Sequence, residues 1–509
     1  MRQVVREFQQ RAEQGDFTAV IDDDGEHTAR GLLAEAARLA EALFPGTDSG
    51  GTVMLQADNS WRTVAATLAV GMRGGVLAVV NRHTTRAEFA AAFEDIRPDA
   101  IVAEPSAIDE WGVPDLIPSQ VDTSVLDGWT VHATTGQPDV TRWSGGVLIG
   151  LTSGSTGRPK GVVQSEEALR YAGQSTIEIN RLSPGDAVAA IVPLSSTAAY
   201  CFGVHLSLLL GGPLVLTAKW DRVVALRRMA DAKVRWTMCV PTMALQMGAE
   251  AAGSGILSCV RAITVGGGPM DRGALARAEQ SLGTKILRVF GMSECLGHTS
   301  PSPEDPEELR LGRDGRPFPG TWLRAVTPDG TEAEPGVSGR AQVRGPSLFL
   351  GYARDGRVKP PALTDDGYFP TGDLLLTHAD GTGTVSIMGR EKDVIIRGGR
   401  NIDITEIERA VASYSRVARA CVAAVPDEVL GERVALLVVT EDGGGIDLPE
   451  VTGHLQSVGL SKGKWPEFVY GIEELPQTKV GKLDRSRARE MAQRFRSTTA
   501  EAVSGGVSS

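Results

Sequence analysis

The stretch VLIGLTSGSTGRPKGVV, residues 147–163, joins two apolar runs through a loop of hydroxyl side chains, glycines and one lysine. Glycines allow neighbouring backbone N–H groups to point into one concavity, hydroxyls donate further hydrogen bonds, and a lysine adds positive charge. Such a loop suits a chain of phosphate groups. We therefore predict an anion-binding loop whose phosphate contacts come from Thr152, Ser153, Gly154, Ser155, Thr156, Gly157 and Lys160.

Two better-known phosphate motifs do not match this loop. The Walker motif requires a Gly-Lys pair, whereas here the lysine lies in Pro159-Lys160-Gly161. The dinucleotide fingerprint G-x-G-x-x-G is also absent from the loop. A flexible surface turn is the alternative, because serine, glycine and proline are common in ordinary loops. The other motifs of the chain decide between these interpretations.

Apolar runs that alternate with helical patterns surround the loop. The runs end in small or polar clusters and cover residues 147–151, 189–193, 262–265 and 285–290, with helical patterns at 165–179 and 271–281. Alternating strands and helices predict a mainly parallel sheet covered on both faces. Ligands of such sheets bind beyond the carboxyl ends of the strands, so we expect the polar clusters to meet at one crevice.

The remaining regions predict further subdomains. A second α/β unit is expected from strands at 72–81 and 98–104 and helices at 29–43 and 86–96. Beyond Pro319, turn signals between short apolar segments indicate a β-rich segment. Past Arg390 a compact unit of mixed helices and strands follows, with helices at 405–411 and 485–496 and strands at 420–425 and 433–439.

Size, charge and cysteine content limit the class of protein. A chain of 509 residues exceeds one ordinary core, so several domains are expected. A net charge of -11 argues against nucleic acid or an anionic membrane as the main partner. The five cysteines form no C-x-x-C pair, and no apolar run reaches the ~18 residues of a membrane span. We expect a soluble, cytoplasmic enzyme that acts on small molecules.

Five motifs together resemble the superfamily of adenylate-forming enzymes, which includes acyl-CoA synthetases, adenylation domains of non-ribosomal peptide synthetases and firefly luciferase. The motifs occur in the family's order and are LTSGSTGRPKGV (151–162), FGMSE (290–294), FPTGDL (369–374), GREKDVIIRGGRNI (389–402) and PQTKVGKLDR (476–485). The resemblance implies an α/β fold: a large N-terminal domain of two α/β subdomains plus a β-rich subdomain, and a small mobile α+β C-terminal domain. The expected boundaries are 1–391 and 392–496, and the small, polar residues 497–509 are expected to be disordered.

The resemblance also implies roles for the charged residues of the motifs. Glu294 matches the Mg²⁺ ligand, a hard oxygen donor for a hard cation. Lys482 matches the catalytic lysine that bridges the carboxylate and the α-phosphate of ATP. Asp373 is expected to accept both ribose hydroxyls, and Arg390 is expected to reach the ribose or a phosphate. Lys160 is expected to assist at the phosphates.

Further positions of the motifs are assigned by the same resemblance. Phe290, where the family usually has tyrosine, can stack on adenine, and Ser293 keeps the hydroxyl of the usual threonine near the catalytic groups. The other nucleotide-binding candidates are Gly267, Gly268, Pro269, Gly291 and Met292. The hinge about which the C-terminal domain turns is Lys392, and the candidates for a coenzyme A tunnel are Arg397, Gly398 and Gly399.

The segment VPLSSTAAYCFGVHLSLLLGG, residues 192–212, resembles the family's Pro-Leu-x-His helix, which borders the acyl pocket. Ser196 stands where histidine or an aromatic residue is usual. Residues 195–203 contain no acidic side chain to hold an ammonium group, which disfavours an α-amino acid substrate. Bulky Tyr200 and Met292 would shorten the cavity, although either could be core filler. The acyl-pocket candidates are Ser196, Thr197, Tyr200, Cys201, Thr242 and Gly266.

These observations predict an ATP-dependent acyl- or aryl-CoA ligase. It would activate a small aryl or short acyl carboxylic acid as acyl-AMP, release pyrophosphate, and transfer the acyl group to coenzyme A, with ATP and Mg²⁺ as cofactors. One alternative is a stand-alone adenylation enzyme that loads a carrier protein. Another is a diazotase that activates nitrite toward an aryl amine, which the altered Ser196 region leaves open. A catalytically dead binding module is disfavoured because Glu294, Asp373, Arg390 and Lys482 are all present.

Overall fold

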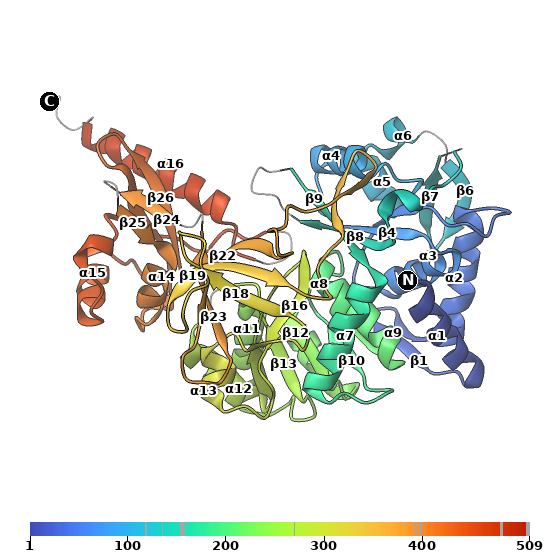
Figure 1. Ribbon diagram of the computed structural model, residues 1–509, viewed down its shortest axis with the longest axis horizontal. Helices are drawn as coiled ribbons and strands as arrows, with labels where there is room; N and C mark the ends of the chain where they lie inside the picture. Colours follow the sequence, from blue (N-terminus) through green and yellow to red (C-terminus); the bar gives the residue numbers. More distant parts are fainter. Residues whose placement is uncertain are drawn as a thin grey trace.

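The computed structural model describes residues 1–509 except 118–119, 135, 153–157, 269, 392–393, 398–399, 479–481 and 505–509. The chain forms a large N-terminal domain built on several sheets and a smaller C-terminal domain, which Figure 1 colours orange to red. This confirms the α/β fold class predicted from the sequence. No helix in the described part of the chain has the length and apolar character needed to cross a membrane.

The first sheet of the N-terminal domain carries the phosphate loop. In spatial order its described strands are β21 (Arg357–Lys359), β20 (Gly351–Arg354), β9 (Lys160–Ser165), β8 (Gly146–Thr152), β4 (Val76–Val80), β3 (Thr52–Gln56), β5 (Ala100–Ala103), β7 (Trp129–Ala133) and β6 (Gln120–Val125). The four central strands β8, β4, β3 and β5 run parallel. Their carboxyl ends therefore open onto the same edge of the sheet.

The second sheet is also mainly parallel. In spatial order its described strands are β14 (Lys285–Arg288), β13 (Ala262–Val265), β12 (Trp236–Cys239), β10 (Val188–Ala190), β11 (Leu214–Leu216), β1 (Thr18–Asp22) and β2 (Gly25–Thr28). Only β2, at the edge, pairs antiparallel within this set. The predicted strand at 262–265 matches β13.

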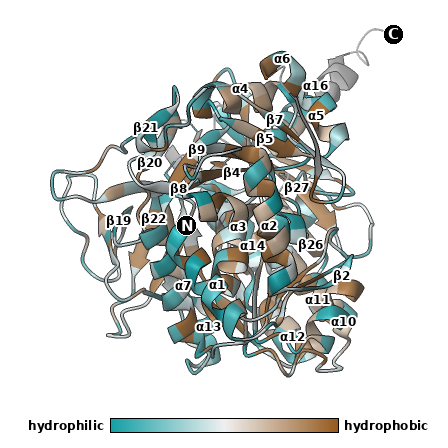
Figure 2. Cartoon of the chain, turned by 90° about the vertical axis from the view of Figure 1, so that its right-hand side faces the viewer, coloured by the Kyte–Doolittle hydropathy of each residue, from teal (hydrophilic) through white to brown (hydrophobic). Residues whose placement is uncertain are grey.

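Alternating side chains explain why helices cover both faces of each sheet. On β4, Leu77 and Val79 belong to the core between the sheets, whereas Ala78 and Val80 belong to a separate outer core. The helices that contribute to the central core are α1 (Arg2–Gln14), α2 (Ala29–Leu43), α3 (Trp61–Arg73), α7 (Glu166–Asn180) and α9 (Leu206–Leu210), with the π-helical turn η2 (Tyr200–His205). Figure 2 shows apolar strands inside and helices with one polar side.

The outer helices complete the layers. Those of the first sheet are α4 (Arg86–Ile96), α5 (Pro105–Trp111) and α6 (Val113–Leu116), and those of the second are α10 (Arg222–Asp231), α11 (Pro241–Ala251) and α12 (Arg272–Leu282). α4 begins at a capping box, in which the Thr85 side chain accepts from the Glu88 N–H and the Glu88 carboxylate accepts from the Thr85 N–H. The predicted bounds of α2 and α4 match the structure.

The β-rich part lies between the two sheets and the C-terminal domain (Figure 1). One antiparallel sheet contains β18 (Trp322–Val326), β19 (Ser338–Arg344), β22 (Phe369–Thr377) and β23 (Val385–Arg390). A smaller one contains β15 (Phe290–Met292), β16 (Cys295–Ser300) and β17 (Arg316–Pro317). Between β16 and β17 the chain forms α13 (Glu307–Gly312), which packs against β14 and α12. The turn between β15 and β16 carries the FGMSE motif.

The C-terminal domain has one sheet with a core on each face. Its described elements are β24 (Val394–Arg397), β25 (Arg400–Asp403), α14 (Ile404–Ala412), β26 (Val417–Asp427), β27 (Gly431–Thr440), α15 (Leu448–Ser457), η3 (Lys462–Lys464), β28 (Phe468–Gly471) and α16 (Arg485–Ser504). α16 extends to Ser504, and the disorder expected from residue 497 stays a prediction. Residues 505–509 lie outside the described part.

Candidate active site

The ends of the phosphate loop are fixed by an antiparallel strand pair. Thr152, the last residue of β8, pairs with Lys160, the first residue of β9, and the Thr152 hydroxyl donates to the Lys160 carbonyl at 3.4 Å. The loop residues Ser153, Gly154, Ser155, Thr156 and Gly157 lie outside the described residues. The Lys160 ammonium lies 5.5 Å from the centre of the Tyr352 ring, close enough for a cation–π contact.

Tyr352 connects this lysine to the carboxylate of the FGMSE turn. Its hydroxyl donates to Glu294 Oε1 at 2.9 Å. Burial raises the pKa of Tyr352, and the Glu294 carboxylate raises it further, so the hydroxyl keeps its proton at neutral pH. The turn is also held through its backbone, because Gln164 Nε2 donates to the Ser293 carbonyl at 2.7 Å and the Phe349 N–H donates to the Glu294 carbonyl at 2.8 Å.

Asp373 and Arg390 face each other across two neighbouring strands. They are paired residues of β22 and β23, and Arg390 Nε lies 3.4 Å from Asp373 Oδ1. The Asp373 side chain is 7% exposed, whereas that of Arg390 is 69% exposed. The carboxylate is therefore held within the protein while the guanidinium remains open to a ligand.

Lys482 comes from the C-terminal domain and reaches the N-terminal one. A Cβ atom built on Gly267, which follows β13, would lie 2.8 Å from Lys482 Cε and 3.2 Å from its Nζ. The residue as a whole is exposed, yet protein atoms surround its ammonium group. This burial lowers the pKa of Lys482, the Arg390 guanidinium lowers it further, and Glu294 opposes both effects. Lys482, Arg390 and Glu294 therefore share one electrostatic environment.

Phe290 lies on β15 beside a buried histidine. The Phe290 and His298 rings meet edge to face, with centroids 4.9 Å apart. Burial lowers the pKa of His298 to about 3, so the imidazole is neutral, and neither of its nitrogens has a hydrogen-bond partner among the described residues. Phe290 is only partly buried, which leaves ring surface for a flat ligand.

The donor set fits a magnesium ion that arrives with a phosphate ligand. Within the described residues, no three His, Cys, Asp or Glu side chains gather as a metal cage. Glu294 offers one carboxylate, with one oxygen engaged by Tyr352. Mg²⁺ in proteins is commonly held by one or two carboxylates together with substrate phosphates and water. Glu294 is thus the residue that would hold it.

Comparisons with known proteins agree with this geometry. Residues 8–353 match the AMP-binding enzyme family, and residues 406–482 match the C-terminal domain of AMP-binding enzymes. The chain belongs to the AMP-binding enzyme family. It is 30% identical to a salicylyl-CoA synthase / salicylate adenylyltransferase of a Streptomyces species, over 96% of this chain and 93% of that protein. It is 31% identical to an indoleacetate–CoA ligase of Aromatoleum aromaticum, over 68% of each chain. The chain is accordingly an AMP-forming ligase.

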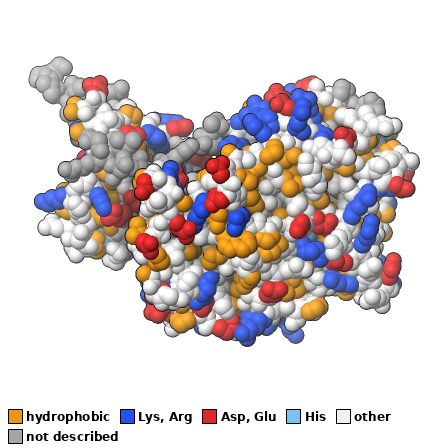
Figure 3. Space-filling view, in the orientation of Figure 1, with side chains coloured by type: hydrophobic (Ala, Val, Ile, Leu, Met, Phe, Trp, Pro, Cys, Tyr) orange, Lys and Arg blue, Asp and Glu red, His pale blue; other side chains and the backbone are white. Residues whose placement is uncertain are grey.

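The chain is also similar to solved structures of another protein, in an ATP-bound and an apo form. ATP-bound MatB from Rhodopseudomonas palustris is 26% identical and has a TM-score of 0.83, with 96% of this chain and 99% of that chain covered. The apo form of the same protein has a TM-score of 0.74, over 97% of this chain and 99% of that chain. Over the whole chain, the structure is therefore more similar to the ATP-bound form than to the apo form. Figure 3 shows the surface hollowed between the two domains.

Three of the residues expected at the acyl pocket pack into hydrophobic clusters. Tyr200 is fully buried in the central core, and its hydroxyl lies 2.9 Å from Thr67 Oγ1. Cys201 is fully buried in the same core. Met292 packs on a different cluster, around Val343. Tyr200 and Cys201 therefore expose no surface in this AMP-binding enzyme, Met292 is only partly buried, and the acyl-pocket role of all three stays a prediction.

The other acyl-pocket candidates lie nearer the crevice. Ser196 is half-buried, and Thr197 begins the short helix α8 (Thr197–Ala199). Thr197 packs directly on β8, because a Cβ built on Gly150 would lie 1.9 Å from its Oγ1. Thr242 and Gly266 are half-buried at the carboxyl ends of β12 and β13. All four residues follow strands of the second sheet, and Thr197 also contacts β8 of the first sheet.

Several predicted positions fall outside the described residues or are occupied by other contacts. Pro269, Lys392, Gly398 and Gly399 lie outside the described part of the chain. The Arg397 guanidinium donates to the Glu467 carboxylate and to the carbonyls of Gly463 and Trp465. Gly268 is exposed beside Gly267, and Gly291 is exposed next to Phe290.

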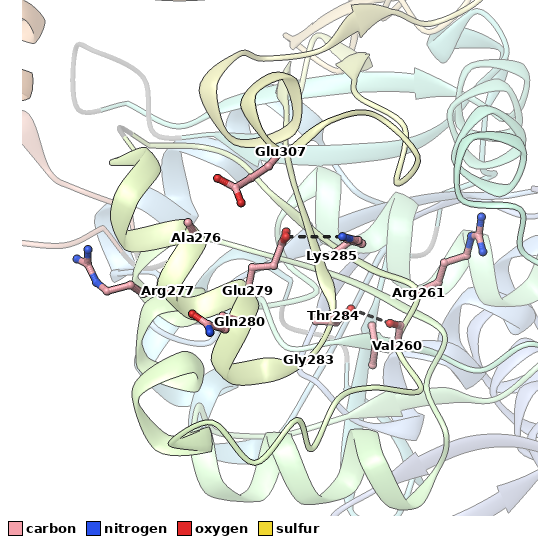
Figure 4. Close-up of a pocket in the computed structure, with 10 residues that line it drawn as sticks. All are labelled: Val260, Arg261, Ala276, Arg277, Glu279, Gln280, Gly283, Thr284, Lys285 and Glu307. Atoms are coloured by element: carbon pink, nitrogen blue, oxygen red, sulfur yellow. Dashed lines mark hydrogen bonds and ion pairs between the residues drawn. The ribbon is translucent and has the colours of Figure 1, made fainter.

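A surface hollow of about 550 Å³ lies away from this site, at the amino ends of β13 and β14. Figure 4 shows that its Arg261 and Arg277 side chains point away from each other. Glu279 in the same hollow pairs with buried Arg310 and lies 4.0 Å from Lys285. The charges of this hollow are therefore neutralised within the protein and do not converge on a ligand.

Proposed function

We propose that this enzyme is an ATP-dependent acyl- or aryl-CoA ligase for a small aryl or short acyl carboxylic acid. The observation that carries the proposal is the position of Lys482, which extends from the C-terminal domain to Gly267 and shares its environment with Glu294 and Arg390. An ammonium group there can neutralise charge between an incoming carboxylate and a phosphate.

In the first step a carboxylate oxygen attacks the α-phosphorus of ATP. The bond from that phosphorus to the bridging oxygen breaks, pyrophosphate leaves, and an acyl-AMP mixed anhydride forms. Lys482 would neutralise the charge that builds up on the α-phosphate, and Glu294 would hold the Mg²⁺ that binds the phosphates. Asp373 and Arg390 would hold the ribose, and Phe290 would stack on adenine.

In the second step a thiol replaces AMP on the acyl carbon. The sulfur attacks the carbonyl carbon, the bond to the phosphate oxygen breaks, and AMP leaves with that oxygen. Lys482 occupies the site in the arrangement described here, so the C-terminal domain must turn before a thiol can enter. We infer that Lys392 is the hinge of this motion and that the segment around Arg397, Gly398 and Gly399 then faces the thiol.

An aryl substrate is supported by charge and by the relatives. Residues 195–203 carry no acidic side chain, so an ammonium group of an amino acid would be buried without a partner. Two relatives are named for salicylate and for indoleacetate, both aromatic acids. We therefore propose an aromatic carboxylic acid as the first class to test.

The proposal is tested by measuring pyrophosphate release from ATP with a panel of aryl, short-chain and amino acids and with nitrite plus an aryl amine, each with and without coenzyme A. We expect an aryl or short-chain acid to give many turnovers only with coenzyme A. Pyrophosphate release at the same rate with and without coenzyme A would support a carrier protein as the acceptor. Turnover with nitrite and an aryl amine alone would instead establish a diazotase.

A further inference from the structure

Two asparagines, the buried Asn59 and the half-buried Asn81, connect the first sheet to the segment that precedes Ser196. Asn59 follows β3, and Asn81 is the first residue after β4, so both lie at the carboxyl edge of the first sheet. Residues 190–195 follow β10 of the second sheet and lead into Ser196 and Thr197. The two side chains therefore bridge the sheets where their carboxyl ends meet.

Asn59 uses its whole amide group on this segment. Its Nδ2 donates to the carbonyls of Ala190 at 3.1 Å and Val192 at 3.2 Å, and its Oδ1 accepts from the Leu194 N–H at 2.8 Å. The residue is only 6% exposed, so water cannot readily replace these bonds. Two donors and one acceptor on one planar group are what a primary amide supplies and a carboxylate does not.

Asn81 makes a simpler contact on the same segment. Its Nδ2 lies 2.9 Å from Ser195 Oγ, and its Oδ1 accepts from the His83 N–H at 2.9 Å. Ser195 is buried, and the next residue, Ser196, closes a turn in which its N–H donates to the Pro193 carbonyl at 2.9 Å. The position of Ser196 thus depends on contacts made from the other sheet.

We propose that Asn59 and Asn81 are positioning residues, which set where Ser196 and Thr197 stand at the acyl side of the crevice. This inference rests on the proposed function for its link to the acid substrate. Thr197 packs so closely on Gly150 that it has no free space to move toward β8. A shift of residues 190–195 therefore changes the positions of Ser196 and Thr197 at the crevice. Loss of either amide should weaken binding of the acid more than binding of ATP.

The experiment compares the same substitution at both positions. In Asn81→Asp the Ser195 hydroxyl can donate to the new carboxylate, so the acid KM should stay close to wild type, whereas Asn81→Ala should raise it about tenfold. Asn59→Asp cannot donate to the Ala190 and Val192 carbonyls, so it should raise the acid KM at least as much as Asn81→Ala. The KM for ATP should change by less than about twofold in all three variants, because the hydrogen bonds that they lose are made with residues 190–195, next to the proposed acyl pocket.

Asn180 supplies the matched control. It is also buried, at the end of α7, and its Nδ2 donates to the Thr176 carbonyl at 3.0 Å. Asn180→Ala should lower the Tm without changing the acid KM. An equal rise in the acid KM in Asn180→Ala, or equal effects of aspartate at 59 and 81, would overturn the proposal.

Hydrogen exchange separates this inference from the proposed function. Amide exchange over residues 190–200 should rise in Asn59→Asp and stay at the wild-type level in Asn180→Ala. Unchanged exchange in Asn59→Asp would overturn the positioning role, whatever the substrate. If no acid supports turnover of the wild-type enzyme, the proposed function fails, and the exchange result still decides the positioning role.

Discussion

Replacing Gly267 by alanine should block the first half-reaction while leaving the second intact. The added Cβ would lie 2.8 Å from Lys482 Cε, below any normal contact, so the lysine must move. Its ammonium would then be displaced, and a misplacement of about 1 Å can lower a rate by about 10²-fold. Gly267 also has φ +85°, so alanine there should cost ~1–2 kcal/mol of folding stability.

Gly330→Ala is the matched control, because Gly330 also has a left-handed φ, +90°, and its added Cβ would meet nothing within 4 Å. The assay measures ATP–pyrophosphate exchange for the first step and thioester formation from synthetic acyl-AMP for the second. We expect Gly267→Ala to lose exchange and to keep thioester formation, since Lys482 must leave for the thiol. Equal exchange in the two variants would refute the assigned position of Lys482, and equal loss of both steps would indicate a damaged nucleotide site.

Three further predictions concern single side chains. Lys482→Met should lower pyrophosphate exchange by about 10²–10³-fold. The pKa of Lys482 is lower in the folded protein than in the unfolded chain, so the charged lysine opposes folding at neutral pH. Lys482→Met should therefore not lower the Tm, and a clear fall in Tm would contradict this. Tyr352→Phe removes the hydrogen-bond donor to Glu294. A hydrogen bond to a charged partner contributes about 1.5–3 kcal/mol, and less at this half-buried position, so the KM for Mg²⁺-ATP should rise. An unchanged KM would contradict a role of Tyr352 in positioning Glu294. Burial lowers the pKa of His205 to about 3 from 6.5, so on lowering the pH the unfolded chain takes up this proton before the folded protein does. The free energy of unfolding therefore has its full value above pH 6.5 and falls as the pH drops toward 3. His205→Leu should therefore reduce the loss of stability between pH 6.5 and 5 by about 2 kcal/mol, measured as Tm against pH, and an unchanged slope would contradict this.

Much of the fold follows from local patterns in the sequence. The helix predicted at 86–96 matches α4 because its start is encoded locally, in the Thr85 and Glu88 capping box. The end of the helix predicted at 485–496 could not be found in this way, because α16 continues through small, polar residues to Ser504. Composition measures average preference, and a helix already begun can extend through residues that would not start one.

The charged site residues could be found from motifs, but the acyl pocket could not. Glu294 and Lys482 stand in short motifs whose spacing is local, and the structure brings them into one environment. Tyr200 and Met292 were assigned by size, which does not distinguish a pocket wall from core. Tyr352 was missed because it lies 58 residues from Glu294 in sequence, and only the folded sheet brings the two together.

The most direct test of the central claim follows one oxygen atom. The enzyme is given ATP, coenzyme A and a substrate acid labelled with ¹⁸O in its carboxylate, and the products are weighed by mass spectrometry. If the carboxylate attacks the α-phosphorus, AMP gains one ¹⁸O and pyrophosphate gains none. Label in pyrophosphate or phosphate, or unlabelled AMP formed together with the thioester, would contradict the account.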